Sequence, residues 1–125
     1  MKAAREHRVP ISPRIVEILE NLPRDGERVF GFFDKKLMLH LLTRMRPGTT
    51  VHGFRSSFRD WVRERTNFPD SIAEAALAHA AGSKVVQAYA RGDLFDKRRR
   101  LMEAWAQFCA DGKTLSKVIS LHANA

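Results

Sequence analysis

Residues 53–66, GFRSSFRDWVRERT, carry the clearest structural signal in the chain, because their apolar side chains recur at helical spacing. The side chains that fall on one stripe of such a helix are Phe54, Phe58, Trp61 and Val62. Charged side chains, among them Arg59, Arg63 and Glu64, lie off this stripe. The pattern is typical of an amphipathic helix that packs one face against a hydrophobic core.

The stretch before this helix contains two more helix signals. Ser12 followed by Pro13 is a typical N-cap and first helical position, and this helix is expected to end near residues 21–23. Asp34 is expected to cap a second helix, which the Pro-Gly pair at 47–48 stops.

Three further helices are expected after residue 66. A capping box, Ser71-x-x-Glu74, begins the first of them, and a glycine turn separates it from a second that carries Tyr89. Asp93 caps the third and longest, with the basic run 97–100 mostly outside its apolar face. That face consists of Leu94, Leu101, Met102, Trp105, Phe108 and Cys109.

The sequence predicts a mainly α fold with a short residual β-hairpin or strand at the N-terminus. Residues 7–11 and 28–30 favour extended structure, the former because Pro10 biases Val9 away from helix. There is no internal repeat and no long linker, so residues 1–112 are expected to form one domain. The tail at 113–125 carries an apolar face too small to fold alone and is expected to dock on another surface.

The charge of the chain indicates a polyanionic partner. The 22 Lys and Arg residues exceed the 14 Asp and Glu residues, which gives a net charge of +8. Nucleic acid is the leading candidate, followed by an anionic membrane surface or an acidic protein. No apolar run is long enough to span a membrane and no signal peptide is recognisable, so we expect a soluble cytoplasmic protein.

Four polar side chains are candidates for chemistry. His52 and Arg55 open the 53–66 helix, where free backbone N–H groups are expected to favour an anion. His79 ends the next helix and Tyr89 follows ten residues later, so all four could converge. Taken singly, each also has a structural interpretation: a helix cap, a solvated arginine, a charge at a helix C-terminus, or an amphipathic core tyrosine.

The ordered set resembles the catalytic domain of tyrosine recombinases, the phage integrase family. The segments that carry the resemblance are Thr50-Val51-His52-Gly53-Phe54-Arg55-Ser56-Ser57-Phe58, Leu77-Ala78-His79 and Tyr89-Ala90-Arg91. The likeness covers nearly the whole chain and is nearest to integrases of satellite phages and genomic islands. It implies that residues 1–112 are the C-terminal part of the catalytic domain, and that the 113–125 tail docks on a neighbouring protomer.

The resemblance also implies a role for each site residue. Tyr89 is the nucleophile that forms a 3′-phosphotyrosine, Arg55 and His52 form the H-x-x-R box, and His79 is the histidine of the third box. Lys2 resembles the hairpin lysine that protonates the leaving oxygen. The implied reaction is site-specific DNA integration and recombination by an assembly of four protomers on double-stranded DNA.

No cofactor, metal or small-molecule substrate is expected, because the side-chain cations neutralise the phosphate. Further contacts to the DNA backbone are expected from Arg59, Lys84 and Arg91, with the run 97–100 as another candidate.

One departure from the family leaves the activity open. The first catalytic arginine of the family precedes the hairpin, and no residue of this chain matches it. Two alternatives therefore remain: a truncated integrase remnant that binds DNA without catalysis, and a helical DNA-binding regulator in which the histidines and the tyrosine are structural.

Overall fold

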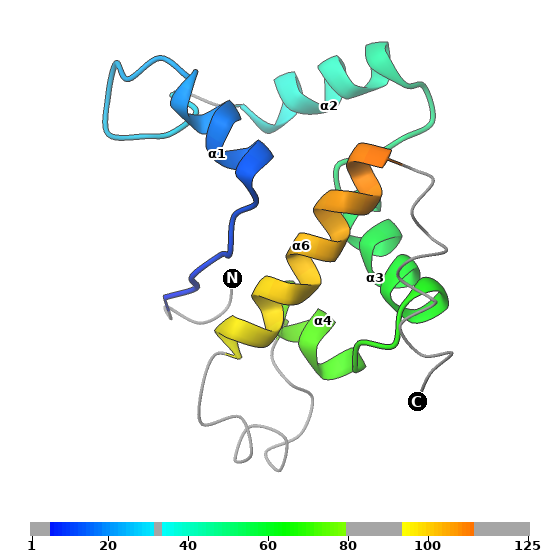
Figure 1. Cartoon of the computed structure of the whole chain (residues 1–125). Coiled ribbons are helices and arrows are strands. Elements are labelled where there is room, and N and C mark those ends of the chain that lie inside the picture. Colours follow the sequence, from blue (N-terminus) through cyan, green and yellow to red (C-terminus); the bar gives the residue numbers. More distant parts are fainter. Residues whose placement is uncertain (1–5, 32–33, 80–93, 112–125) are drawn as a thin grey trace.

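The computed structural model describes residues 6–31, 34–79 and 94–111 of the chain. This part is mainly helical, as the sequence predicts. Its helices are α1 (Pro13–Glu20), α2 (Lys35–Met45), α3 (Gly53–Arg65), α4 (Asp70–Ala76) and α6 (Phe95–Asp111). Figure 1 shows α3 and α4 beside the long helix α6. No helix in these ranges is both long enough and apolar enough to cross a membrane.

The helix starts agree with the sequence at two positions and disagree at a third. Ser12 caps α1 through its hydroxyl, and the Asp34 carboxylate accepts a 3.0 Å hydrogen bond from the Lys36 N–H at the start of α2. The predicted capping box is wrong, because α4 already begins at Asp70 and Ser71 therefore lies inside its first turn. Glu74 has other partners, described below.

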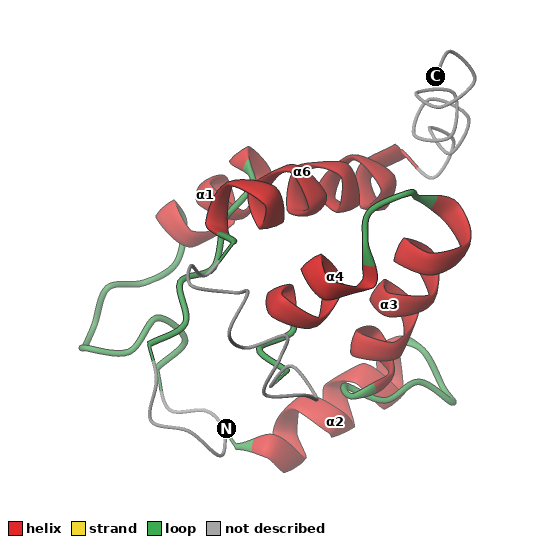
Figure 2. Ribbon diagram, turned by 90° about the horizontal axis from the view of Figure 1, so that it is seen from below, coloured by secondary structure: helices red, strands yellow, loops and turns green. Residues whose placement is uncertain are grey.

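The hydrophobic core lies between α3, α4 and α6, and all three helices contribute to it. Its buried members are Phe58, Trp61, Val62, Ile72, Ala73 and Leu101. The view from below in Figure 2 shows the same three helices gathered around this region. The short helix α4 is therefore held by packing on both of its neighbours, since seven residues are too few to form a stable helix alone.

Four aromatic rings join α3 to α6. The ring centroids of Trp61 and Trp105 lie 5.0 Å apart, and those of Phe58 and Trp105 lie 5.3 Å apart in an edge-to-face arrangement. Phe108 stacks on Trp61 at 5.5 Å. Each such pair contributes about 0.5–1.5 kcal/mol beyond the area that it buries. The expected apolar face of α6 is thus confirmed for its central residues, whereas Cys109 is exposed.

Helices α1 and α2 bury no residue fully. The apolar side chains of α2 remain largely in solvent, as shown by Leu41 at 55% and Met45 at 73% exposure. Phe54 is 59% exposed, so the prediction that it lies in the core with the rest of its stripe is wrong. The reason is its place in the first turn of α3, where it faces Met38, Met45 and neighbouring apolar residues instead of α6.

The two predicted strands do not form in the described residues. Residues 6–12 have no regular secondary structure, and residues 28–31 form a turn closed by a 3.4 Å bond from the Gly31 N–H to the Arg28 carbonyl. The first half of the expected hairpin, residues 1–5, lies outside the described residues, as do the expected helix around Tyr89 and the 113–125 tail.

A buried arginine ties the N-terminal segment to α6. Arg98 is 1% exposed and donates a 2.8 Å hydrogen bond to the Arg8 carbonyl. The Arg98 and Arg8 guanidinium groups both lie over the Phe95 ring, at 5.6 and 4.7 Å. The basic run 97–100 is therefore not uniformly exposed. Arg98 is buried and does not present its guanidinium to a DNA backbone.

Candidate functional site

Arg55 and His79 come together at the contact between α3 and α4. Arg55 lies in the first turn of α3 and is half-buried, whereas His79 follows the C-terminus of α4. The Arg55 Nη2 atom lies 2.6 Å from His79 Nε2 and donates a 2.7 Å hydrogen bond to the Leu77 carbonyl. Two residues 24 positions apart thus meet where an anion could reach both.

The end of α4 explains how His79 reaches this place. The His79 N–H donates to the Glu74 carbonyl at 2.9 Å, and the Ala78 N–H donates to the Ala75 carbonyl at 3.2 Å. This pair of bonds is a Schellman motif, in which the residue after the C-cap is left-handed. Ala78 has a φ of 55° and occupies that position. The motif reverses the chain and turns His79 back toward α3.

Glu74 links the two helices at this point. One carboxylate oxygen, Oε2, lies 2.8 Å from His79 Nδ1, and the other, Oε1, lies 2.8 Å from Arg59 Nη2. A chain of charged and polar groups therefore runs from Arg59 through Glu74 and His79 to Arg55. Glu74 was not predicted as a site residue, because its spacing from Ser71 matched a capping box at the start of the helix.

His52 occupies the N-cap position of α3 and is exposed, with no side-chain capping bond. The expectation of free backbone N–H groups beside it is wrong. The N–H groups of Gly53, Phe54 and Arg55 donate to the carbonyls three residues before them, at 3.1, 3.3 and 3.1 Å. Successive tight turns therefore occupy these N–H donors. An anion at this helix start would have to be bound by side chains instead.

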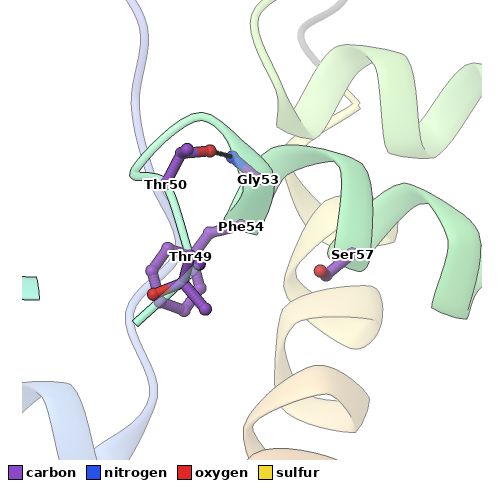
Figure 3. Close-up of a pocket in the computed structure, with 6 residues that line it drawn as sticks. Thr49, Thr50, Gly53, Phe54 and Ser57 are labelled. Carbon is purple, nitrogen blue, oxygen red and sulfur yellow. Dashed lines mark hydrogen bonds between the residues drawn. The ribbon is translucent and has the colours of Figure 1, made fainter. Parts of the chain in front are cut away.

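A shallow hollow of about 230 Å³ lies next to the His52–Arg55 segment. Its lining includes the hydroxyl groups of Thr49, Thr50 and Ser57, as Figure 3 shows. The Thr50 hydroxyl accepts a 3.0 Å bond from the Gly53 N–H. A Cβ at position 53 would lie 3.1 Å from that hydroxyl oxygen, a tight contact that favours glycine there as long as the hydroxyl keeps its bond to the Gly53 N–H.

A second arginine–carboxylate pair crosses from α3 to α4. The Arg63 side chain bonds both carboxylate oxygens of Asp70, at 3.1 to 3.3 Å. The hydrogen bond from Arg63 and its positive charge hold the pKa of the Asp70 carboxyl below its usual value, and the same bond raises the pKa of Arg63. Arg55, Arg59 and Arg63 thus project from successive turns of α3 toward α4.

Among residues 6–31, 34–79 and 94–111, no three His, Cys, Asp or Glu side chains gather in a way that could bind a metal ion. Four of the residues selected from the sequence lie outside these ranges, and the structure does not place them relative to Arg55 and His79. They are Lys2, Lys84, Tyr89 and Arg91.

Three integrases resemble this chain over most of its length. The prophage integrase IntA of Escherichia coli K12 is 35% identical over 118 residues, which cover 85% of this chain and 28% of IntA. The prophage integrase IntS of the same strain is 33% identical, and the integrase of Shigella phage Sf6 is 32% identical; each match covers 86% of this chain and 31% of the relative.

The chain therefore spans about three tenths of the length of the relatives that it matches. No family model matches it, and no solved structure matches it significantly. Several integrases agree with this chain over a similarly large share of its length. This likeness supports membership of the chain in the phage integrase family.

Proposed function

We propose that this chain takes part in site-specific DNA integration as a strand-cleaving domain, with Tyr89 as the nucleophile. The observation that supports this most is the meeting of Arg55, in α3, with His79, just after α4, since two of the family's site residues face each other from different parts of the chain. A helical regulator with purely structural histidines gives no reason for this pairing. The relatives are integrases by name, which supports DNA as the substrate.

Arg55 has the donors that such a site needs. Its Nη2 atom bonds Leu77 and His79, while the N–H groups on Nε and Nη1 have no partner among the described residues. A planar guanidinium can direct such donors to two oxygens of one phosphate, and its charge persists at any physiological pH. Arg55 is therefore well suited to hold a DNA phosphate beside His79.

The proposed step is an exchange of one phosphodiester bond for another. The Tyr89 oxygen attacks the phosphorus and loses its proton to His52, the bond to the 5′ oxygen breaks, and Lys2 protonates that oxygen. The products are a 3′-phosphotyrosine and a free 5′-hydroxyl. Negative charge grows on the non-bridging oxygens, where Arg55 and the His52 ring, which now carries the proton from Tyr89, donate hydrogen bonds. His79 contributes by holding the Arg55 guanidinium in place. A second 5′-hydroxyl reverses the step and joins a new strand.

Several other features fit DNA as a partner. The net charge of +8 favours association with a polyanion, and we propose Arg59, Lys84 and Arg91 as contacts to its backbone. In the free protein the Arg59 guanidinium is paired with Glu74, so its contact with DNA would be shared with that carboxylate. Assembly of four protomers on DNA and docking of the 113–125 tail on a neighbour belong to the same proposal.

The decisive experiment is a suicide-substrate assay. The chain is incubated with nicked duplex DNA, and a denaturing gel reveals any covalent protein–DNA adduct. We expect an adduct with the native chain and none with Tyr89→Phe, which removes only the nucleophilic oxygen. DNA binding by both proteins should weaken steeply with salt, because bound phosphates release counterions.

Two other outcomes would change the conclusion. Salt-sensitive DNA binding without an adduct would leave a DNA-binding integrase domain that does not cleave by itself. An adduct that persists in Tyr89→Phe would refute Tyr89 as the nucleophile.

A further inference from the structure

We infer that Glu74 is a positioning residue of this site, which fixes the ring of His79 in one tautomer with Nε2 directed at Arg55. The position of Glu74 and His79 does not depend on the proposed function, but the effect of Glu74 on strand cleavage rests on it. It adds to the site a residue that neither the H-x-x-R box nor the histidine and tyrosine segments contain.

The argument begins with the donors and acceptors around the ring. A guanidinium has N–H donors and no acceptor, so His79 Nε2, 2.6 Å from Arg55 Nη2, must accept through its lone pair. A neutral imidazole with an acceptor at Nε2 carries its hydrogen on Nδ1. Nδ1 lies 2.8 Å from a Glu74 oxygen, and a carboxylate is an acceptor for that hydrogen. Both contacts thus require the same tautomer.

Glu74 is itself held by contacts of its side chain and of its backbone. Its second oxygen pairs with Arg59, its backbone carbonyl accepts the N–H of His79, and its side chain is only 25% exposed. The same residue therefore binds His79 through both its backbone and its carboxylate. Arg59 also balances the negative charge, so that the carboxylate can lie near a phosphate site without strongly repelling the phosphate.

The consequence for the proposed reaction is geometric. Nε2 is the ring atom on the side of Arg55, and the Arg55 donors that have no partner among the described residues mark where a phosphate would bind. A ring released from Glu74 could rotate or exchange its hydrogen, and Nε2 would lose its fixed direction. Second partners of this kind commonly set which nitrogen of a histidine acts at a site.

The test uses the isosteric variant Glu74→Gln in the full chain. An amide has one oxygen where the carboxylate has two and carries no charge, so it cannot both pair with Arg59 and accept from His79 Nδ1 as the carboxylate does. Long-range proton–nitrogen NMR spectra of the labelled protein, recorded where the ring is neutral, report which nitrogen carries the hydrogen. We expect His79 to be in the Nδ1–H form in the native chain and in a mixture of both tautomers in Glu74→Gln.

Asp70→Asn is the matched control. It makes the same carboxylate-to-amide change on the same helix and removes a pair with another arginine of α3, but it does not contact His79. We expect the native His79 tautomer in this variant. An equal shift in Asp70→Asn would mean that any loosening of the α3–α4 contact releases the ring, and it would overturn the inference.

Two further results would also overturn it: a native ring with its hydrogen on Nε2, or the same single tautomer in the native chain and in Glu74→Gln. The adduct assay keeps this inference separate from the proposed function. If the native chain forms no adduct, cleavage by this chain is refuted while the tautomer result stands. If it forms an adduct and Glu74→Gln leaves the tautomer unchanged, only the positioning role fails.

Discussion

At the α3–α4 contact, single side chains satisfy several partners at once. Arg55 uses one nitrogen for a helix-terminal carbonyl and for His79, and Glu74 divides its two oxygens between His79 and Arg59. Arg63 and Asp70 form a simpler pair at the same contact. This difference allows the proposed site to be separated experimentally from ordinary cross-helix ion pairing.

Replacing Arg55 with lysine should abolish most strand cleavage while keeping the net charge. A lysine ammonium is a compact charge without the planar fork, so it cannot bind Leu77, His79 and a phosphate together. Loss of one such donor typically slows a reaction by about 100-fold or more. We expect Arg55→Lys to reduce the rate of adduct formation to this extent, measured on nicked duplex DNA.

Arg63→Lys serves as the control for that measurement, because Arg63 lies on the same helix and also faces α4. It should keep adduct formation within a few-fold of the native rate. Equal losses in both variants would argue against a specific role for Arg55.

Asp70 should make the stability of the domain depend on pH in the acid range. Because Arg63 lowers the pKa of the folded carboxyl below 3.8, Asp70 stabilises the fold above that pH, and this contribution disappears as the pH falls through the lowered value. Melting temperatures of the native chain and Asp70→Asn should therefore differ most near neutral pH and converge in acid. The difference should be small and should shrink in high salt, since the pair is exposed. A difference that grew on acidification would contradict this assignment.

At the level of the helices, the turn at the C-terminus of α4 contains a strained residue and at the same time positions His79. Ala78 has a left-handed backbone conformation. This conformation costs about 1–2 kcal/mol for any residue with a Cβ atom. The same turn brings His79 beside Glu74 and Arg55. The short helix tolerates this because α3 and α6 pack on it.

Ala78→Gly should stabilise the domain by about 1 kcal/mol, because glycine adopts a positive φ without steric strain. Ala75→Gly is the matched control, with the same substitution inside α4, and should destabilise by about 0.5–1 kcal/mol. Urea denaturation of both variants measures these changes. Destabilisation by both would show that the left-handed turn is not strained.

Leu101 is the fully buried apolar residue that α6 contributes to the core. It has no exposed surface, so truncation should leave a cavity and cost about 2–5 kcal/mol of unfolding free energy. Leu101→Ala is expected to lower the urea midpoint strongly. Glu103→Ala, two residues along on the exposed side of the same helix, should change stability by less than about 0.5 kcal/mol.

At the scale of the whole molecule, the described residues divide into a packed part and a loosely attached part. Helices α3, α4 and α6 share all the buried apolar residues of the core, whereas α1 and α2 bury none. The hydrogen bond from Arg98 to the Arg8 carbonyl ties the first segment to this core.

Hydrogen exchange should reveal this division. Amides of α3 and α6 should exchange only when the core opens, whereas those of α2 should exchange much faster, because local opening exposes little apolar surface there. Exchange followed by mass spectrometry or NMR measures the contrast in a single sample. Protection of α2 equal to that of α3 would mean that α2 is covered in solution, for example by a second copy of the chain.

The helices were largely predictable because their signals are local. Ser12, Pro13 and Asp34 act through hydrogen bonds and backbone preferences within one turn, and the starts of α1 and α2 follow from them. The stripe of Phe58, Trp61 and Val62 likewise identified the buried face of α3. The two strands were not predictable in this way, since a strand requires a partner that the local sequence does not reveal.

The sequence by itself indicated the resemblance to phage integrases, the helical character and the residue types of the proposed site, because these depend on local pattern and residue identity. Only the tertiary structure decided that Arg55 meets His79, that Glu74 stands between His79 and Arg59, and that Arg98 is buried while Phe54 is exposed. Each of these facts depends on how the helices pack against one another. Periodicity identifies the apolar face of a helix but not the element that packs on it. The position of Glu74 shows this most clearly: its spacing suggested a local cap, but the Schellman turn after α4 made it the partner of a histidine.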